Sequence, residues 1–237
     1  MTQRKPPSAQ QLPLSLPHRA EMTRDAFLAG EANARAIALV DAWREWPAAT
    51  VLLAGPAGSG KTHVVEIWRA LAGATVIAAR DLDDDGAARL VAAGPVAVED
   101  VHAGPLDEAA LFHLLNLAGE RGVPLLLTSR VWPSALPVKL ADLASRLRAA
   151  RLVEIGEPDD DLRRRVLVKL FADRQLAVEP SVMDYILLHM ERSLAAANRV
   201  VEAIDREALA AGAPVTRRLA AAAMARLGEG AGDEAAG

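Results

Sequence analysis

The chain has 237 residues, of which 51% are hydrophobic, enough for one large domain or for a core domain with a smaller second one. Its 27 basic and 31 acidic residues give a net charge of −4, so no general electrostatic attraction to a phosphate backbone is expected. The absence of cysteine excludes disulfides, thiolate zinc sites and cysteine nucleophiles. No run of about 18 apolar residues occurs. We therefore expect a cytoplasmic protein that neither spans a membrane nor binds DNA sequence-specifically by itself.

Residues 1–19 are rich in proline, which predicts an extended tail. Within it, Leu12, Leu14 and Leu16 occupy alternate positions, so an extended backbone presents all three side chains to one side. The tail cannot bury this stripe by itself. From the tail alone, a proline-rich linker and a binding motif that begins at Gln11 both remain open.

From about residue 50, short apolar runs alternate with helix-length segments, which predicts an α/β fold with a parallel five-stranded sheet. After Pro158 the strand signals stop and only helical patterns follow. We divide the chain into the tail 1–19, a core 20–157, an all-helical unit 158–227 and a disordered tail 228–237. The expected strands are 50–54, 75–79, 96–98, 124–128 and 152–155, and the expected helices of the second unit are 159–175, 180–190, 193–211 and 215–227.

A complete Gly-x4-Gly-Lys-Thr pattern, Walker A, lies between a predicted strand and a predicted helix, which is the context that this phosphate-binding loop requires. Backbone N–H groups and the helix N-terminus attract phosphate, while Lys61 should reach the β- and γ-phosphates and Thr62 should hold Mg²⁺. The alternative is a glycine turn that happens to contain lysine. The predicted nucleotide-binding residues here are Gly55, Pro56, Ala57, Gly58, Ser59, Gly60, Lys61, Thr62 and His63.

Polar residues end two other predicted strands at the same edge of the sheet. Glu99 and Asp100 follow the strand 96–98, and we assign Glu99 to the metal and Asp100 to orienting a hydrolytic water. The alternative is that the two acids only cap a strand end. The hydroxyl of Ser129 is placed to touch a γ-phosphate or the water.

The segments 55–62, 96–100, 125–130 and 140–147 together resemble the bacterial replication-initiator (DnaA) family of AAA+ proteins, over about residues 20–227. The resemblance implies an AAA+ core with a helical lid and ADP or ATP with Mg²⁺ as ligands. It also implies that the backbone around Phe27 and Leu28 flanks the base. In this family the arginine of a Ser-Arg pair reaches a nucleotide on a neighbouring subunit, which implies a trans-acting catalytic role for Arg146.

Two departures narrow the resemblance. Initiators carry a DNA-binding domain after the lid and a further domain before the core, and this chain has room for neither. It is similar instead to the Hda branch, regulators of the initiator whose short tail binds the sliding clamp. The implied clamp-binding residues are Gln11, Leu12, Leu14 and Leu16, and the implied partners are the DNA polymerase sliding clamp, the initiator DnaA and a possible second copy of the chain.

The initiators' lid arginine falls at Ala196 here, with Arg192 and Arg199 close by. The loss of one γ-phosphate contact argues against autonomous ATP hydrolysis and favours a protein that holds ADP. Two alternatives remain open: an autonomous AAA+ ATPase, such as a helicase loader or remodeller, and a small-molecule kinase on a P-loop fold.

Overall fold

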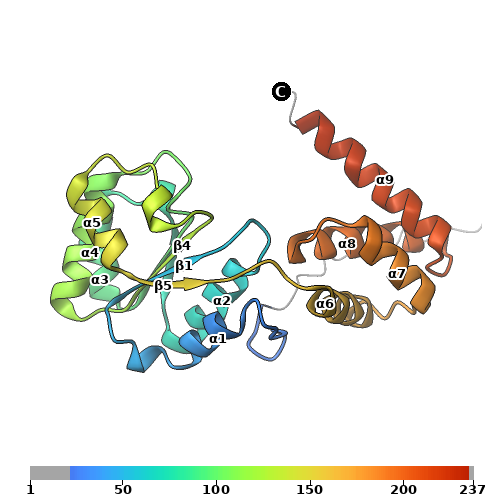
Figure 1. The fold of residues 1–237 in the computed structure, drawn as a ribbon, viewed down its shortest axis with the longest axis horizontal. Helices are drawn as coiled ribbons and strands as arrows, with labels where there is room; N and C mark the ends of the chain where they lie inside the picture. The colour runs from blue at the N-terminus through green and yellow to red at the C-terminus, as the bar shows by residue number, and fades with distance from the viewer. Residues whose placement is uncertain (1–21, 235–237) are drawn as a thin grey trace, which may run out of the picture.

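A computed structural model of the protein describes residues 22–234, with side chains up to residue 228. The predicted clamp-binding residues Gln11, Leu12, Leu14 and Leu16 lie outside the described part of the chain, as do the rest of the tail 1–19 and residues 235–237. The described residues form a sheet unit and a helical unit (Figure 1). The chain passes from the last strand of the first unit directly to the first helix of the second.

Five parallel strands form one sheet in the order β2-β3-β4-β1-β5. Since all strands are parallel, their carboxyl ends meet at one edge, where ligands of open α/β sheets bind. The prediction of a parallel five-stranded α/β sheet followed by helices is confirmed. The strands are β1 (Thr50–Ala54), β2 (Thr75–Ala78), β3 (Val96–Glu99), β4 (Leu125–Ser129) and β5 (Arg151–Glu154).

Helices cover both faces of the sheet, and alternate strand residues divide between the two cores. In β1, Val51 and Leu53 pack with α1 and α2, while Leu52 and Ala54 pack with α3, α4 and α5. This double cover explains why the strands read as continuous apolar runs. The helices of this unit are α1 (Ala34–Asp41), α2 (Lys61–Ala72), α3 (Asp84–Ala93), α4 (Glu108–Arg121) and α5 (Ala141–Ala149), with short 3₁₀ turns at Trp43–Glu45, Ala79–Asp81 and Pro133–Ala135.

The helical unit has its own apolar core, formed by α6 (Asp160–Asp173), α7 (Pro180–His189), α8 (Leu194–Ala211) and α9 (Arg217–Glu234). The final helix continues past residue 227, where we predicted a disordered tail to begin. Ala220 and Ala223 anchor α9 in the core, and glycine lowers helix stability by only about 1 kcal/mol per residue without forbidding helical backbone. Among residues 22–234, no helix is both long and apolar enough to cross a membrane.

Candidate functional site

The loop between β1 and α2 has the conformation of a phosphate cradle. Gly58 and Gly60 adopt φ angles of 71° and 103°, which side chains other than glycine rarely tolerate. Lys61 is buried, and its Nζ donates hydrogen bonds to the carbonyl oxygens of Gly55 at 2.7 Å and Pro56 at 2.8 Å. The loop therefore holds the ammonium group inside its own curve, at the N-terminus of a twelve-residue helix that favours anions.

The Lys61 ammonium lies in a charged neighbourhood. Burial lowers the pKa of Lys61, the carboxylates of Asp100 and Glu99 oppose this shift, and the nearby cation Arg130 adds to it. Two acids and a second cation thus surround the loop. A bound phosphate would compensate the cations more completely than the two carboxylates do.

Thr62 and Glu99 face each other across the ends of α2 and β3. The Thr62 hydroxyl donates a hydrogen bond of 2.8 Å to Oε1 of Glu99, and burial raises the pKa of that carboxyl group. A hydroxyl and a carboxylate are hard oxygen donors of the kind that Mg²⁺ prefers, so the pair fits the predicted metal site. Asp100 lines the neighbouring cavity, with its N–H held by the Thr128 hydroxyl at 2.9 Å.

Ser129, predicted to touch a γ-phosphate or the water, makes local hydrogen bonds. Its side chain is fully buried, and its hydroxyl donates to the carbonyl oxygen of Val131 at 2.7 Å while accepting the Val131 N–H at 3.0 Å. Both hydrogen bonds of the hydroxyl are made within this local turn, and Ser129 does not line the cavity. The next residue, Arg130, lines the cavity instead. In the sequence, the only indication that Arg130 lines the cavity was its position directly after the polar end of β4.

A cavity of about 380 Å³ lies between the loop and the helical unit. Its charged side chains come from the sheet unit and from α6, and its apolar wall combines the segment before α1 with α6 and α8. The predicted Gly55, Pro56 and Ser59 shape the loop without lining this cavity. The lining residues are Met22, Ala26, Leu28, Ala57, Gly58, Gly60, Lys61, Thr62, His63, Asp100, Arg130, Val166, Lys169, Leu170, Asp173, Leu194, Ala195 and Asn198.

Of the two residues predicted to flank the base, Leu28 lines the cavity and Phe27 does not. Phe27 is buried and meets the His63 ring edge to face, with ring centres 5.1 Å apart. The His63 ring is also held by the backbone, because its Nε2 lies within hydrogen-bond distance, 3.1 Å, of the carbonyl oxygen of Thr23. Burial lowers the pKa of His63, so the neutral ring is favoured. Phe27 thus supports a wall of the cavity from behind.

The helical unit touches the phosphate loop directly. The N–H of Leu194, at the start of α8, donates to the carbonyl oxygen of Gly58 at 2.9 Å. Ser193 caps the same helix by accepting the N–H of Ala196 at 3.0 Å. A β-carbon on Gly58 would lie only 2.9 Å from that of Ala195. The helical unit therefore closes over the loop as a lid.

No lid arginine reaches the cavity among the residues that the structure describes. Ala196, the position implied for that arginine, is buried within the lid. Arg192 pairs with Asp160 at 3.3 Å, and Arg199 pairs with Glu191 at 2.8 Å.

Arg146 lies apart from the cavity, on the last turn of α5. Its side chain is exposed, and it forms no ion pair with any residue in the described range 22–234. It therefore cannot serve the phosphates of its own chain in this arrangement. The trans-acting role stays a prediction.

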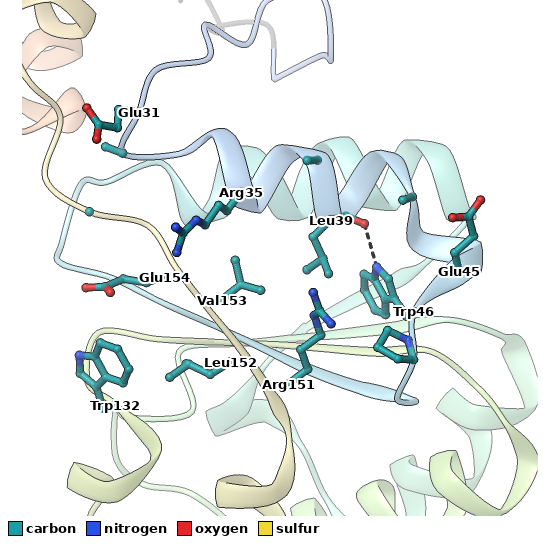
Figure 2. Close-up of a pocket in the computed structure, with 15 residues that line it drawn as sticks. Glu31, Arg35, Leu39, Glu45, Trp46, Trp132, Arg151, Leu152, Val153 and Glu154 are labelled. Carbon is teal, nitrogen blue, oxygen red and sulfur yellow. Dashed lines mark hydrogen bonds between the residues drawn. The ribbon is translucent and has the colours of Figure 1, made fainter.

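A second, larger hollow of about 1120 Å³ lies along the free edge of the sheet. Figure 2 shows it between α1 and β5, with Trp46 and Trp132 at opposite ends and the Trp46 ring N–H bonded to the carbonyl oxygen of Leu39 at 2.8 Å. No residue of the phosphate loop lines this groove. The smaller cavity of about 380 Å³ is lined by the glycine loop and by three cations, and it is therefore the candidate nucleotide site.

Comparisons with known proteins agree with this architecture. Domain III of the Thermotoga maritima replication initiation protein DnaA superposes with a TM-score of 0.71 at 16% identity, covering 89% of this chain and 98% of that one. The chain has an AAA+ fold related to that of DnaA. AMPPCP-bound DnaA from Aquifex aeolicus superposes with a TM-score of 0.63 at 22% identity, covering 78% of this chain and 65% of that one. The Thermotoga maritima RuvB Holliday junction branch migration motor superposes with a TM-score of 0.69 at 18% identity, covering 88% of this chain and 72% of that one.

These identities are low, so the likeness concerns the fold. No protein-family model and no curated protein matches the sequence. The chain spans about 65% of the length of the Aquifex DnaA chain. The resemblance to DnaA that the motifs indicated is thus confirmed for the AAA+ fold and left as a proposal for the regulatory branch.

Proposed function

We propose that this protein is a nucleotide-bound AAA+ regulator of DNA replication initiation. In this proposal it binds the sliding clamp through Gln11, Leu12, Leu14 and Leu16, and it stimulates ATP hydrolysis by the replication initiator, which limits re-initiation. One observation carries the proposal: among the described residues, the lid that closes over a complete phosphate loop brings no arginine to the cavity, while the candidate trans-acting Arg146 is exposed and unpaired within residues 22–234. Such a site suits holding a nucleotide better than turning it over.

The residues of the site suggest how ADP or ATP would be held. The loop N–H groups and the N-terminus of α2 would bind the phosphates, and Lys61 would exchange its bonds to Gly55 and Pro56 for phosphate oxygens. The base would lie against Leu28 and His63, on the apolar side of the cavity. The AMPPCP held by the Aquifex DnaA of similar fold supports a nucleotide of this type.

Thr62 and Glu99 are the residues that would hold Mg²⁺, which neutralises phosphate charge when bound. Asp100 lines the cavity beside them and would orient a water molecule. Two carboxylates at this edge could support hydrolysis in cis, but no lid arginine within the described residues lines the cavity to help them. We therefore expect slow intrinsic turnover.

Arg146 would act on the ATP of the initiator. A guanidinium group supplied in trans stabilises the charge that develops on the transferred phosphoryl group, and its forked donors match two phosphate oxygens. The exposed last turn of α5 leaves this side chain free to meet another subunit. The tail would bring the protein to the clamp, and so to the site where replication has begun.

The test mixes clamp loaded on DNA, this protein and initiator carrying labelled ATP, and follows conversion to ADP. Arg146→Ala should lower the stimulated rate by about 10³–10⁵-fold. Arg148→Ala is the matched control, because Arg148 lies on the same helix and is likewise exposed. Rapid conversion with Arg146→Ala would show that the catalytic cation comes from elsewhere.

A second candidate function is an autonomous AAA+ ATPase, such as a helicase loader or remodeller. It is favoured by Asp100, which lines the cavity together with Lys61 and Thr62, and by the likeness in fold to the RuvB motor. ATP turnover of the isolated protein separates the two functions. Turnover near 1 s⁻¹ or above, in the ordinary range of enzymes, would favour the autonomous ATPase.

A further inference from the structure

Leu28, which lines the nucleotide cavity, belongs to a turn that one buried side chain closes. The carboxamide of Asn33 donates from Nδ2 to the carbonyl oxygen of Leu28 at 3.1 Å, and its Oδ1 accepts the N–H of Gly30 at 2.8 Å. Asn33 is only 2% exposed, so water competes little for these two hydrogen bonds. The segment 28–33 is therefore held together as one piece, and whatever fastens this turn also positions Leu28.

The sheet unit holds this turn from one side. The N–H of Gly156, shortly after β5, donates to the carbonyl oxygen of Ala32 at 2.9 Å. Just before the turn, Phe27 packs against the ring of His63. Neither contact involves the carbonyl group of Ala29, the residue that follows Leu28.

The lid holds the same turn through Arg165 on α6. Nη2 of Arg165 donates to the carbonyl oxygen of Ala29 at 2.9 Å, while Nε donates to the carboxylate of Asp161 at 2.9 Å, one helical turn earlier. Leu162 packs on the next residue of the turn, since a β-carbon on Gly30 would lie 3.0 Å from its Cδ2. Among residues 22–234, the bond from Arg165 to Ala29 is the one side-chain hydrogen bond that joins the lid to the sheet unit.

The apolar wall of the cavity thus has one part on the turn and another part on the lid. On α6, Val166 and Leu170 line the cavity one helical turn apart, whereas Arg165 does not line it. Arg165 therefore joins the two parts of the wall from outside the cavity. The phosphate loop has a separate link to the lid, the bond from the N–H of Leu194 to the carbonyl oxygen of Gly58.

We infer that Arg165 is a positioning residue for the nucleoside: it sets the spacing between Leu28 and the α6 side chains, so that the base meets an assembled apolar wall. The inference rests on the proposed nucleotide binding and adds the residue that organises its base end. Without this hydrogen bond, the ligand itself must order the two parts of the wall, and the cost of this ordering lowers its affinity. A ligand that fills only the phosphate loop does not use the wall, so its affinity does not depend on Arg165.

The test measures dissociation constants of the full chain for ADP and for pyrophosphate, both with Mg²⁺, by titration calorimetry. Arg165→Ala should raise the constant for ADP by about three- to tenfold while changing that for pyrophosphate by less than about twofold. Arg165→Lys should recover part of the ADP affinity, because an ammonium group still donates hydrogen bonds but lacks the planar fork that serves Ala29 and Asp161 together. Arg164→Ala is the matched control and should change neither constant, since its side chain is 47% exposed against 43% for Arg165 and pairs with Asp184 inside the lid.

The outcomes separate this inference from the proposed function. If the unaltered protein binds neither ligand, the proposed nucleotide binding fails and the inference falls with it. If the unaltered protein binds ADP and Arg165→Ala has the same ADP affinity as Arg164→Ala, only the role of Arg165 is refuted, whether or not pyrophosphate binds tightly enough to measure. Equal losses for ADP and pyrophosphate in Arg165→Ala would also refute that role, because they would show an effect on the whole site.

The melting temperature of each variant shows whether it is folded. If that of Arg165→Ala falls, Arg165→Met is measured in the same way, because methionine keeps an apolar stem without a hydrogen-bond donor. An ADP affinity of Arg165→Met equal to that of Arg164→Ala would then refute the inference.

Discussion

Gly58→Ala tests whether the lid rests on the phosphate loop as described. The new β-carbon would lie 2.9 Å from the β-carbon of Ala195 and 3.0 Å from that of Ser193, at a φ of +71°. Left-handed backbone costs an alanine about 1–2 kcal/mol, and overpacking commonly adds about 1–3 kcal/mol. We expect a loss in the free energy of unfolding of about 2–5 kcal/mol if the lid stays in place. If the lid moves instead, ADP affinity falls, because Leu194 and Asn198 line the cavity.

Gly122→Ala isolates the backbone part of this effect. Gly122 has a similar φ of +65° at the end of α4, but a β-carbon there would meet nothing within 4 Å. This control should lose only about 1–2 kcal/mol and should keep its ADP affinity. Both variants are measured by urea unfolding and by calorimetric ADP titration. Equal losses of stability with equal ADP affinities would refute the contact between lid and loop.

Three further predictions concern single features of the chain. Lys61→Ala should weaken ADP binding by about ten- to hundredfold in calorimetry, because it removes the buried cation of the loop, and an unchanged affinity would contradict the site assignment. Joint replacement of Gln11, Leu12 and Leu14 by alanine should abolish binding to the clamp in surface plasmon resonance while ADP affinity stays unchanged. The backbone N–H groups of Lys139 and Leu140 donate hydrogen bonds to the Glu108 carboxylate and hold the pKa of Glu108 below its ordinary value. The ionised carboxylate therefore contributes fully to the stability of the fold above the unfolded-state pKa of about 4.3, and this contribution is lost as the pH falls through the folded-state pKa. Between pH 6 and pH 3 the melting temperature of Glu108→Gln should therefore fall less than that of the unaltered protein, and equal falls would contradict this.

The phosphate loop could be predicted from the sequence because it depends on contiguous residues. A buried strand, the glycines at 58 and 60 and the lysine at 61 lie in one short run, and each has a local physical role. The strands were predictable for a similar reason. Both faces of the sheet are covered, so each strand forms an unbroken apolar run that stands out from the helical periods around it.

The sequence does not fix which direction a side chain takes at the end of an element. Ser129 and Arg130 are neighbours, and either could face the cavity from sequence alone. The hydroxyl of Ser129 bonds locally to Val131, which a short polar side chain does readily after a strand. The resemblance implied that the backbone around Phe27 and Leu28 flanks the base, and it said nothing of the Phe27 ring, which is buried against His63.

The contact between lid and loop could not be predicted, because residues far apart in the chain form it. The Gly58 carbonyl and the Leu194 N–H are brought together only when the whole helical unit folds back on the sheet unit. No local sequence pattern around residue 194 predicts this hydrogen bond, because every residue in the first turn of a helix has an N–H group without a partner inside the helix.

The positions of the arginines bear on the proposed division between holding one nucleotide and acting on another. The two arginines near the start of α8 are engaged with Asp160 and Glu191, so closure of the lid brings no guanidinium to the phosphates. Arg130 lines the cavity from the end of β4 and so belongs to the sheet unit, not to the lid. Arg146 does not line the cavity, so under the proposed function it would act on a nucleotide held by another molecule. If Arg146 acts only in trans, as proposed, Arg146→Ala should lose the stimulation of the initiator and keep its own ADP affinity, and a loss of ADP affinity in calorimetry would contradict this division.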